Sequence, residues 1–426
     1  MISRYAGVAA AAIAMAVGAN VPAAAQSGGA RTLDKKLIEY GWDVPFPDFV
    51  RDNIREMEKR PFDGLIFKLH GGRNVLQPKR WDEAQFRDDY EAVQAIRWER
   101  FTDNFVSMLA ASDQDWFSDE HWEAIEHNVR LVAKAARLGR CVGVCFDPEP
   151  YGTNPWLHAQ AAHRETKGFA EYEQMTRQRG AQFVRAILAE LPDPKILTFF
   201  QISVLRSLLT PMAPEERGAK LAQQHYGLVP AFLNGMLDAG GDKVTIIDGN
   251  ESAYYYTEQR QYFEAYHTMA QRALLLIDPA LWHTYRTQVQ AGQALYIDQY
   301  FGLRQGRKTY GHYMEPGDQA KWFEHNVYWA LHTADEYVWC YSERMNWWTN
   351  ENVPEGCEEA IRSARAKLDE GRALGIDLEP IIEGAHQRQR QEQTTRVTPQ
   401  GREQSAWSRM IPGSPEADVS GTWVLR

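Results

Sequence analysis

Two carboxylates at the end of an apolar run have types and a spacing that suit chemistry. The run Val142–Phe146 is followed by Asp147, Pro148 and Glu149. Because alternate residues of a strand point the same way, Asp147 and Glu149 should emerge on one face at its C-terminal end. Two neighbouring acids resist ionising together, so one pKa tends to rise, and an acid that keeps its proton near neutral pH can act as a general acid. The alternative is that the pair caps a strand or holds a loop.

Polar side chains also close other apolar runs of the chain. Besides Asp147 and Glu149, they are Trp42, Asp43, Lys68, His70, Gln201, Asp248, Asn250, Glu251, Asp298, Tyr300 and Glu343. If the runs are parallel strands, their C-terminal ends converge on one rim and surround one cavity. Any one of these residues could be a helix cap or an ion-pair partner, but burying several carboxylates together costs stability unless function demands it. We predict that the catalytic residues are Glu149, Asp147, Asp298 and Glu343, and that Trp42, Asp43, His70, Gln201, Asp248, Glu251 and Tyr300 bind substrate.

Aromatic residues accompany these carboxylates. Trp339 and Tyr341 alternate with Glu343 on one strand face, Trp347 and Trp348 follow in a loop, and Tyr151 and Trp156 flank the acid pair. Flat apolar faces beside carboxylates suit sugar rings, so all six aromatic residues are predicted to bind substrate. Core packing is an equally good account of Trp339, whereas Trp347 and Trp348 are expected to be exposed on the rim.

The elements that must position these residues alternate from Leu37 onward. Eight β-type runs are Ile38–Asp43, Gly64–His70, Thr102–Leu109, Cys141–Pro148, Ile196–Ser203, Lys243–Asn250, Ala294–Phe301 and Glu336–Glu343. Strand–helix alternation implies parallel pairing, and eight units predict a closed (β/α)8 TIM barrel of the α/β class, with long βα loops and a polar C-terminal extension. An open doubly wound sheet would normally carry a glycine-rich first turn, and no G-x-G-x-x-G follows any of these runs.

Helices are predicted between the runs. The candidates are Asp48–Lys59, Asp119–Leu138, Phe169–Leu191, Leu228–Ala239, Ala253–Leu276, Asp318–Thr333 and Glu355–Leu374. Pro47 and Ser118 mark helix starts, and the Gly240-Gly241 pair marks a helix end. Residues 71–98 and 151–167 are expected to be long loops on the face that carries the site.

The composition divides the chain into four parts. Arg4, the apolar stretch Ala9–Val17 and the small residues Ala23–Ala25 are typical of a signal peptide over residues 1–25, cleaved after Ala25, which predicts a periplasmic or secreted bacterial protein. Residues 26–36 lead into a barrel over residues 37–380. Residues 381–426 are a linker-like extension, with a linker or surface strap over 386–405 and a short strand over 418–425.

Charge and motifs exclude several functions. The formal net charge is −10 and there are no blocks of Lys or Arg, so neither nucleic acid nor an anionic membrane surface is an expected partner. No stretch after the leader is long and apolar enough to span a bilayer. G-x-S-x-G, phosphate-loop and H-E-x-x-H motifs are absent, and we expect no cofactor and no metal. The sequence does not indicate an oligomeric state.

The four cysteines are expected to be buried free thiols. Cys141 and Cys145 would lie about 13 Å apart on one strand, too far to bridge each other. With Cys340 and Cys357 they form no C-x-x-C pair, and no histidine spacing completes a zinc site.

The segment Phe146-Asp147-Pro148-Glu149-Pro150-Tyr151 resembles the fourth-strand D-x-E motif, with its nearby tyrosine, of chitinase-like and endo-N-acetylglucosaminidase-like TIM-barrel glycoside hydrolases. The resemblance extends over residues 37–375. It implies that Glu149 is the proton donor and that Asp147 orients a substrate N-acetyl group, which attacks the anomeric carbon. The fuller chitinase pattern has another acid two positions before the aspartate, where this chain has Cys145, and Pro148 and Pro150 also depart from it.

The sequence therefore predicts an exported glycoside hydrolase that acts on a polysaccharide or glycan by carboxylate general acid/base catalysis. A mechanism without substrate assistance fits the same barrel, with Glu149 as acid/base and Asp298 or Glu343 as nucleophile or water-activating base. Two other functions stay open: a carbohydrate-binding barrel without catalysis, and a metal-dependent lyase or hydrolase on the same fold.

Overall fold

The computed structural model describes residues 34–396, except 111–112 and 307. The chain divides after Asp34 into two units, Met1–Asp34 and Lys35–Arg426. The predicted signal peptide with its cleavage point after Ala25, and the strand expected over 418–425, lie outside the described residues. The elements below all belong to the second unit.

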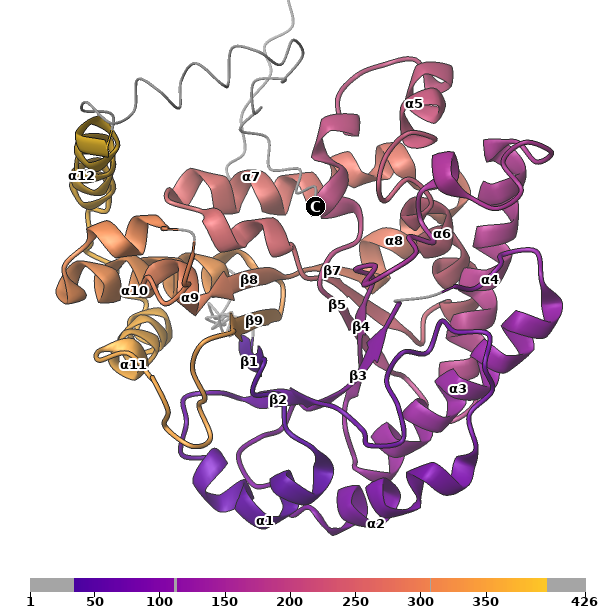
Figure 1. The fold of residues 1–426 in the computed structure, drawn as a ribbon, viewed down its shortest axis with the longest axis horizontal. Helices are drawn as coiled ribbons and strands as arrows, with labels where there is room; N and C mark the ends of the chain where they lie inside the picture. The colour runs from indigo at the N-terminus through magenta and orange to yellow at the C-terminus, as the bar shows by residue number, and fades with distance from the viewer. Residues whose placement is uncertain (1–33, 111–112, 307, 397–426) are drawn as a thin grey trace, which may run out of the picture. The chain divides into compact units, whose positions relative to one another are not determined.

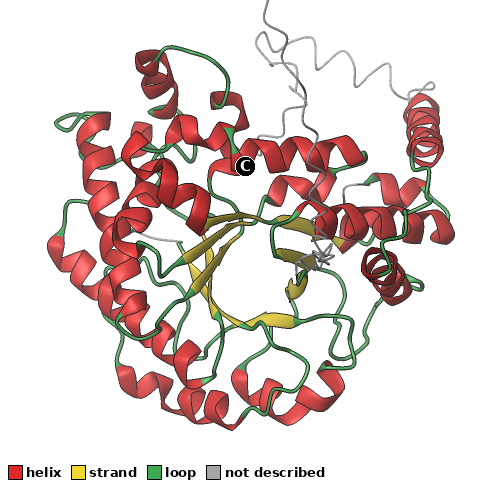
Figure 2. Cartoon of the chain, turned by 180° about the vertical axis from the view of Figure 1, so that it is seen from behind, coloured by secondary structure: helices red, strands yellow, loops and turns green. Residues whose placement is uncertain are grey.

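Parallel strands form a ring at the centre of this unit, with helices around them (Figures 1 and 2). Among the described residues they are β1 (Lys36–Gly41), β2 (Gly64–Phe67), β3 (Phe105–Leu109), β4 (Gly143–Asp147), β5 (Lys195–Thr198), β6 (Thr245–Asp248), β7 (Val289–Ala291), β8 (Gln293–Tyr296) and β9 (Tyr337–Ser342). Neighbours are hydrogen-bonded in the order β7-β6-β5-β4-β3-β2-β1-β9-β8. Because only Gly292 separates β7 from β8, these two strands occupy one position of an eight-position barrel. The predicted α/β TIM barrel is confirmed.

Helices cover the outside of the strands (Figure 2). The α-helices are α1 (Pro47–Met57), α2 (Arg87–Ala95), α3 (Asp119–Leu138), α4 (Phe169–Leu188), α5 (Pro214–Leu221), α6 (Val229–Gly240), α7 (Gln259–Ala270), α8 (Trp282–Gln288), α9 (Ile297–Tyr300), α10 (Pro316–Thr333), α11 (Cys357–Asp369) and α12 (Glu379–Arg396). The 3-10 helices are η1 (Glu83–Phe86), η2 (His158–Gln160), η3 (Ile202–Leu208), η4 (Glu251–Tyr255), η5 (Arg272–Leu276), η6 (Pro279–Leu281) and η7 (Tyr310–Tyr313).

Burial on both faces explains why the strands are apolar throughout. Every residue of β4 is buried, because side chains on one face fill the barrel and those on the other pack under the helices. The helix layer is packed closely as well. A Cβ on Gly235 would lie 1.8 Å from the Arg177 carbonyl oxygen, and one on Gly180 would lie 2.1 Å from that of Phe232, so these glycines let α4 and α6 approach each other.

Gly292 is the point at which the seventh position of the barrel changes partner. β7 pairs with β6, whereas β8 pairs with β9. A Cβ on Gly292 would lie 2.8 Å from Ile247 Cγ2, and its N–H donates to the Asp248 carbonyl oxygen at 2.9 Å. The Asn250 side chain then donates to Gln293 Oε1 at 2.7 Å. The wall is therefore closed here by the continuous chain and a side-chain bridge.

Each of the eight predicted runs overlaps a strand, but the seventh is displaced. It begins at Val289 instead of Ala294, and the residues expected at its end form α9. The helix expected over Ala253–Leu276 is broken into η4, α7 and η5, because Glu258 and Gln261 form a capping box that starts α7 afresh. Residues 71–98, expected as a loop, contain η1 and α2.

The linker expected from residue 381 onward begins as a helix, α12. Its surface is polar apart from a narrow apolar stripe with Ile382 and Ala385, both of which are buried. Glu392 accepts hydrogen bonds from Lys308 Nζ and the Tyr313 hydroxyl, each at 2.7 Å. The composition of this segment gave no sign of a helix because tertiary contacts supply much of its stability.

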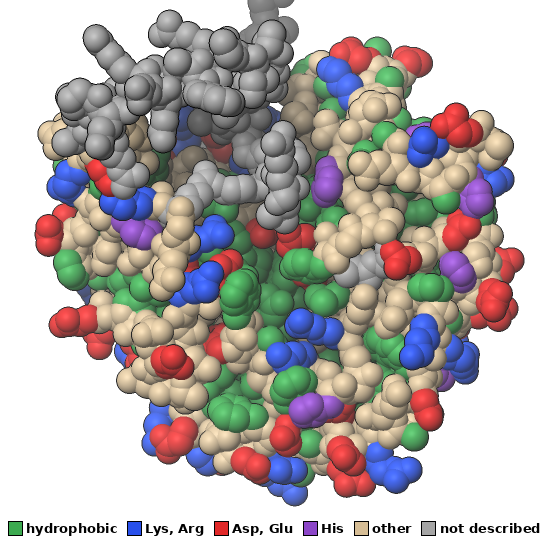
Figure 3. Space-filling view, viewed as in Figure 1, with side chains coloured by type: hydrophobic (Ala, Val, Ile, Leu, Met, Phe, Trp, Pro, Cys, Tyr) green, Lys and Arg blue, Asp and Glu red, His purple; other side chains and the backbone are tan. Residues whose placement is uncertain are grey.

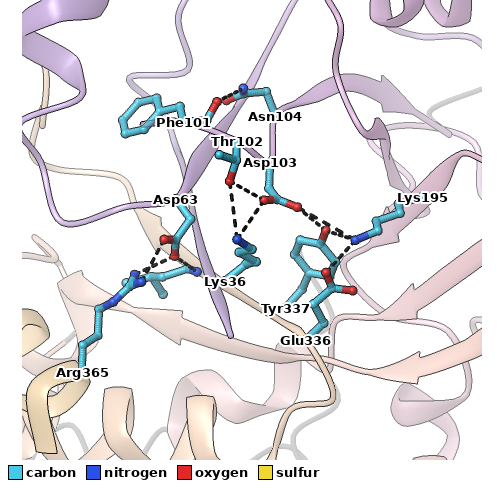
Figure 4. A network of polar contacts seen from close by, with 11 residues as sticks. Lys36, Asp63, Phe101, Thr102, Asp103, Asn104, Lys195, Glu336, Tyr337 and Arg365 are labelled. Atoms are coloured by element: carbon cyan, nitrogen blue, oxygen red, sulfur yellow. Dashed lines mark hydrogen bonds and ion pairs between the residues drawn. The ribbon is translucent and has the colours of Figure 1, made fainter. Parts of the chain in front are cut away.

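Paired charges hold the N-terminal end of the barrel (Figure 4). Asp103, just before β3, accepts a hydrogen bond from the Tyr337 hydroxyl and lies 3.4 Å from Lys36 Nζ. Lys195, at the start of β5, lies 2.6 Å from Glu336. These contacts tie the starts of β1, β3, β5 and β9 together across the bottom of the barrel.

Asp63 anchors the start of β2 in the same way (Figure 4). Its oxygens accept from the Arg365 guanidinium at 2.6 and 2.8 Å and from the Leu37 N–H at 2.7 Å. Arg365 belongs to α11, so this bond joins the helix layer to the first two strands.

The four cysteines are buried and free, as predicted. Within the described ranges, no helix combines the length and apolarity needed to cross a membrane.

Candidate active site

Asp147 and Glu149 lie together at the C-terminal end of β4. Asp147 is the last residue of the strand and is buried, whereas Glu149 is half-buried. The Glu149 N–H donates to Asp147 Oδ1 at 2.8 Å. The hydroxyl of Tyr151, an exposed residue, lies 3.0 Å from Asp147 Oδ2 and 2.8 Å from Glu149 Oε2. The two acids therefore share one hydroxyl, in keeping with the common face that strand alternation predicts.

The Tyr151 hydroxyl gives these acids a path for a proton. A phenol has one proton to donate and lone pairs with which to accept. When Asp147 is protonated, its O–H can donate to Tyr151 while Tyr151 donates to Glu149. A proton would therefore move from the buried Asp147 to the more accessible Glu149.

Asp147 has the properties of an acid that keeps its proton near neutrality. Burial, followed by the charge of Glu149, raises the pKa of Asp147 to about 7. The Glu149 N–H, the Tyr151 hydroxyl and the positive charge of Arg73 act in the opposite direction, and burial prevails. The raised pKa that the sequence predicted for one member of the pair thus falls on Asp147.

Glu251 is the third carboxyl of this group. It begins η4 after β6, following Asn250, whose φ of 44° lies in the left-handed region. Burial, and then the charges of Glu149 and Asp147, raise the pKa of Glu251 well above its ordinary value. Burial and the same three carboxylates raise the pKa of the Tyr226 hydroxyl. Glu251, predicted to bind substrate, therefore lies beside the acid pair.

Asp298 and Glu343 form a second acid group. Asp298 Oδ2 accepts from the Glu343 N–H at 2.8 Å, and the Tyr341 hydroxyl donates to Glu343 Oε1 at 3.4 Å. Burial raises the pKa of Asp298 to about 6; N–H donors, that of Glu343 first, oppose this rise, and the charge of Glu343 adds to it. Among the described residues, Asp298 Oδ1 is buried without a hydrogen-bond partner. This group follows β8 and β9, whereas the first follows β4 and β6.

Aromatic rings fill the barrel beneath these acids. Trp339 stacks on Phe199 with ring centroids 4.1 Å apart, and its Nε1–H donates to the Gly249 carbonyl at 2.9 Å. Tyr341 is half-buried and stacks on Tyr254 at 5.6 Å. Trp339 is thus core, which is the alternative that the sequence left open, and Tyr341 lies above it.

Figure 3 looks onto the C-terminal end of the barrel. It shows a hollow lined by hydrophobic side chains, with acidic side chains inside it and basic side chains at its margin. A cavity of about 820 Å³ lies between the loops that follow β1, α9 and β9, and its lining includes Trp42, Glu343 and Arg344. Trp42 is 60% exposed, and the Arg344 guanidinium lies 5.1 Å from the centroid of its ring. An exposed indole beside carboxylates is a suitable surface for a sugar ring.

In the part of the chain that the structure describes, no three His, Cys, Asp or Glu residues are grouped as they would be around a metal ion.

Neither a protein-family model nor a curated protein matches this chain. Among solved structures, it is similar to a GH18 chitinase from Pseudoalteromonas aurantia, with 12% sequence identity, 78% of this chain and 100% of that chain covered, and a TM-score of 0.38. A likeness of this size does not assign a function.

Asp248 was predicted to bind substrate, but its carboxylate binds the turn after β5. Its carboxylate accepts from the N–H groups of Gln201 and Ser203, each at 2.9 Å, and from the Ser203 hydroxyl. Gln201 is 1% exposed. Both residues shape the wall of the site from within, and neither presents a free face to a ligand.

Asp43 and Trp347 bind each other. Asp43 Oδ2 accepts from the Trp347 N–H at 2.9 Å, and burial raises the pKa of the Asp43 carboxyl. Trp347 is fully buried and packs edge-on against Phe62 at 5.1 Å. The predicted exposure of Trp347 on the rim is therefore wrong, because Asp43 holds its backbone and its ring packs into the core. Trp348 is half-buried.

Three other predicted substrate-binding residues have structural contacts. Trp156 is 1% exposed, and its Nε1–H donates to the Pro148 carbonyl at 2.7 Å, so it supports the acid pair from below. Tyr300 is fully buried against α10, which is inconsistent with substrate contact. His70 is exposed, but it stacks on the ring of Phe46 in the β1–α1 loop. Its Nε2 lies 3.1 Å from Asp48 Oδ1.

Sequence reasoning missed several residues around the hollow. They are Tyr40, Arg73, Tyr226, Tyr254, Tyr296, Arg304 and Arg344. Strand alternation could have found Tyr40, two residues before Trp42, and Tyr296, two before Asp298. Arg73 and Tyr226 lie in loops, where no periodic pattern indicates a direction.

Proposed function

We propose that this protein is a glycoside hydrolase in which Glu149 protonates the leaving oxygen of a glycosidic bond. The observation that carries the proposal is the hydrogen-bonded series Asp147–Tyr151–Glu149 at the end of β4. Catalytic groups of TIM barrels lie at this end of the strands, and glycosidic bonds are hydrolysed by paired carboxyl groups with an acid of raised pKa. Glu149 is accessible from the hollow, and Asp147 supplies its proton through Tyr151.

The balance of the reaction requires one acid and one base. Protonation of the bridging oxygen lets the bond to the anomeric carbon break, and its electron pair leaves with that oxygen. A water molecule then adds at the anomeric carbon and gives its proton to an ionised carboxyl group, and proton exchange with solvent returns the acid and the base to their starting forms. Glu251, in its ionised form, is the first candidate for this second carboxyl, because its electrostatic coupling to Glu149 and Asp147 indicates that it lies close to them. Asp298 and Glu343, the two partners that the sequence predicted, belong to the other acid group.

A carbohydrate substrate fits the surroundings of this site. Trp42 is exposed at the edge of the cavity, and the half-buried Tyr341 lies beside Glu343. The signal-like residues 1–25 support export to the periplasm or beyond, where a polysaccharide or glycan would be met.

The test is a screen of bacterial, plant and algal polysaccharides with product analysis. Wild type is compared with Glu149→Gln and with a control, Glu91→Gln. Glu91 is exposed on α2 and has no ion-pair partner among the described residues. We expect wild type and the control to release the same products, and Glu149→Gln to lose at least about 100-fold in rate.

Equal hydrolysis by wild type and Glu149→Gln would contradict the assignment. Glycan binding without product release over long incubation would favour the carbohydrate-binding barrel. Loss of activity on chelation, with recovery on adding a metal, would favour a metal-dependent enzyme.

The second carboxyl is tested with Glu251→Gln and Asp298→Asn on the same substrate. If Glu251 is the partner, its variant loses activity to about the extent of Glu149→Gln, whereas Asp298→Asn changes mainly KM. The reverse pattern would assign the role to Asp298. The anomeric configuration of the first product, followed by NMR, separates retention from inversion.

A further inference from the structure

Four basic side chains lie on one half of the rim. Lys68 and Arg73 follow β2, Arg304 follows α9, and Arg344 follows β9. Because β2, β1, β9 and β8 are consecutive neighbours in the barrel, these residues occupy one arc of it. Among the described residues, none of the four has a carboxylate within ion-pair distance.

Aromatic rings hold three of these cations in place of carboxylates. A ring fixes the position of a cation and leaves its charge and its N–H donors available to a ligand. The distances from cation to ring centroid are 4.5 Å from Lys68 to Phe46, 5.8 Å from Arg304 to Tyr296, and 5.1 Å from Arg344 to Trp42.

Arg73, the fourth cation, lies near the acid pair, because its carbonyl accepts from the Leu109 N–H at 2.8 Å and Leu109 of β3 is paired with Asp147 of β4. Its positive charge opposes the rise that burial and Glu149 produce in the pKa of Asp147. It also opposes the rise in the pKa of the buried Tyr40 hydroxyl. Burial, followed by the charge of Arg73, lowers the pKa of Lys68, so the two cations lie close to each other.

The carboxyls of the same rim cancel less of this positive charge than their number indicates. Burial raises the pKa values of Asp147, Glu251 and Asp298, so protons neutralise these acids at a pH where free carboxyls are ionised. In Figure 3, basic side chains border the hollow on more than one side, with acidic ones inside it.

We infer that the glycan bound at this rim carries anionic groups, carboxylate or sulfate, and that Lys68, Arg73, Arg304 and Arg344 bind them. The inference rests on the proposed function, because the glycan is the one whose bond Glu149 protonates. Guanidinium groups bind carboxylate and sulfate oxygens with paired, charge-assisted hydrogen bonds. A neutral polysaccharide would desolvate four cations and give them no counter-charge. The chain is acidic overall, so the positive arc is a local feature of the site.

The test measures binding without turnover. The Glu149→Gln protein is run by affinity electrophoresis in native gels that contain polygalacturonate for carboxylate, κ-carrageenan for sulfate, or hydroxyethyl cellulose as a neutral polymer. Two further proteins carry Lys68→Gln with Arg73→Gln, or Arg304→Gln with Arg344→Gln. The matched control carries Arg97→Gln and Arg100→Gln, two exposed arginines before β3 at the opposite end of the barrel.

We expect at least one anionic polymer to retard the Glu149→Gln protein and the neutral polymer to have little effect. Each rim pair should weaken that binding by about tenfold, which corresponds to about 1.4 kcal/mol, and the control pair should leave it unchanged. Added salt should weaken binding more in the parent than in the rim variants. The anionic polymer that binds identifies the group as carboxylate or sulfate.

Preference for the neutral polymer, no retardation by any polymer, or equal binding by the rim and control variants would overturn the inference. These outcomes are independent of catalysis. A protein that binds an anionic glycan and hydrolyses nothing would fail the proposed function alone, and one that hydrolyses only neutral glycans would fail this inference alone.

Discussion

The carboxylates at the two ends of the barrel differ in whether a basic side chain lies next to them. At the N-terminal end, Asp103 lies near Lys36, Lys195 near Glu336, and Asp63 receives two bonds from Arg365. At the C-terminal end, the carboxyls are Asp147, Glu149, Glu251, Asp298 and Glu343, and in the described part of the chain none of these has a basic residue within ion-pair distance.

The difference shows which end is organised for stability and which for chemistry. A buried charge that is hydrogen-bonded and paired keeps its charged form and fastens the strands that carry it. A buried acid without a counter-ion takes up a proton, as the raised pKa values of Asp147 and Glu251 show. Displaced pKa values of this kind are what acid/base catalysis requires. Substitutions at the N-terminal end should therefore change the free energy of unfolding, and substitutions at the C-terminal end should mainly change kcat.

The largest effect is expected for Glu149→Gln at the C-terminal end. Loss of a general acid should lower kcat by about 10²- to 10⁴-fold, because the leaving oxygen is no longer protonated. The free energy of unfolding should change little, since Glu149 is half-buried and carries no ion pair. Initial rates and urea unfolding of the same preparation measure both quantities. A large loss of stability with kcat unchanged would reverse the comparison.

Asp103→Asn should have the opposite effect at the N-terminal end. Breaking a buried, paired carboxylate costs about 3–5 kcal/mol, because the charge that faces Lys36 and accepts from the Tyr337 hydroxyl is lost. Urea unfolding measures this loss, while kcat per folded molecule should stay at the wild-type value. Asp52→Asn, at an exposed ion pair with Arg51, is the control and should leave stability unchanged. A normal free energy of unfolding in Asp103→Asn would show that the bottom network does not hold the barrel.

Asp147→Asn should stabilise the protein in a pH-dependent way. The folded-state pKa of about 7 lies above that of a free aspartate, so between about pH 4 and pH 7 the folded protein binds a proton that the unfolded chain has released. Stability that depends on Asp147 therefore falls as pH rises through this window and is constant above it. The variant should gain up to about 4 kcal/mol over wild type at pH 8 and almost nothing at pH 4. Melting curves from pH 4 to 8 test this, and a constant difference would contradict it.

Tyr151→Phe should lower kcat by about tenfold, or about 1.4 kcal/mol in activation free energy, because the hydroxyl between Asp147 and Glu149 is lost. KM should change little, and the alkaline limb of the pH–rate profile near pH 7 should shift as Asp147 loses a hydrogen bond. Tyr90→Phe, whose hydroxyl bonds to the Leu131 carbonyl on the outer helices, is the matched control. An unaltered profile in Tyr151→Phe would remove the tyrosine from the proton path.

The smallest effect is expected for Trp42→Ala. The exposed indole should contribute about 1 kcal/mol to substrate binding, so KM should rise by about fivefold with kcat and stability unchanged. Trp282→Ala, at an exposed tryptophan on α8, serves as the control and should leave KM at the wild-type value. Identical KM values for the two variants would place the sugar elsewhere on the rim.

The sequence predicts the barrel and the acid pair because both depend on local patterns. Strand runs, helix caps and the Asp147–Glu149 spacing can be recognised within a few residues of sequence. Whether a side chain lies in the core or on the rim depends instead on contacts with distant parts of the chain. Tyr300 and Trp347 lie close to rim residues in sequence and yet pack into the core, because α9 turns one chain segment and Asp43 holds the other. Glu251 joins the acid pair only through the pairing of β4, β5 and β6, which a single strand does not reveal.

The break at Gly292 affects how the two acid groups are spaced. Glu251 follows β6, which is paired with β7, and Asp298 follows β8, which is paired with β9. Between these two carboxyls the hydrogen-bonded sheet is therefore interrupted, and the hydrogen bond from Asn250 to Gln293 crosses the break. Retaining and inverting hydrolysis differ by only about 1–4 Å in carboxyl separation. If Asp298 is the partner of Glu149, a change of the amide or the glycine at this break is thus a way to alter the separation of the catalytic carboxyls without substituting an acid.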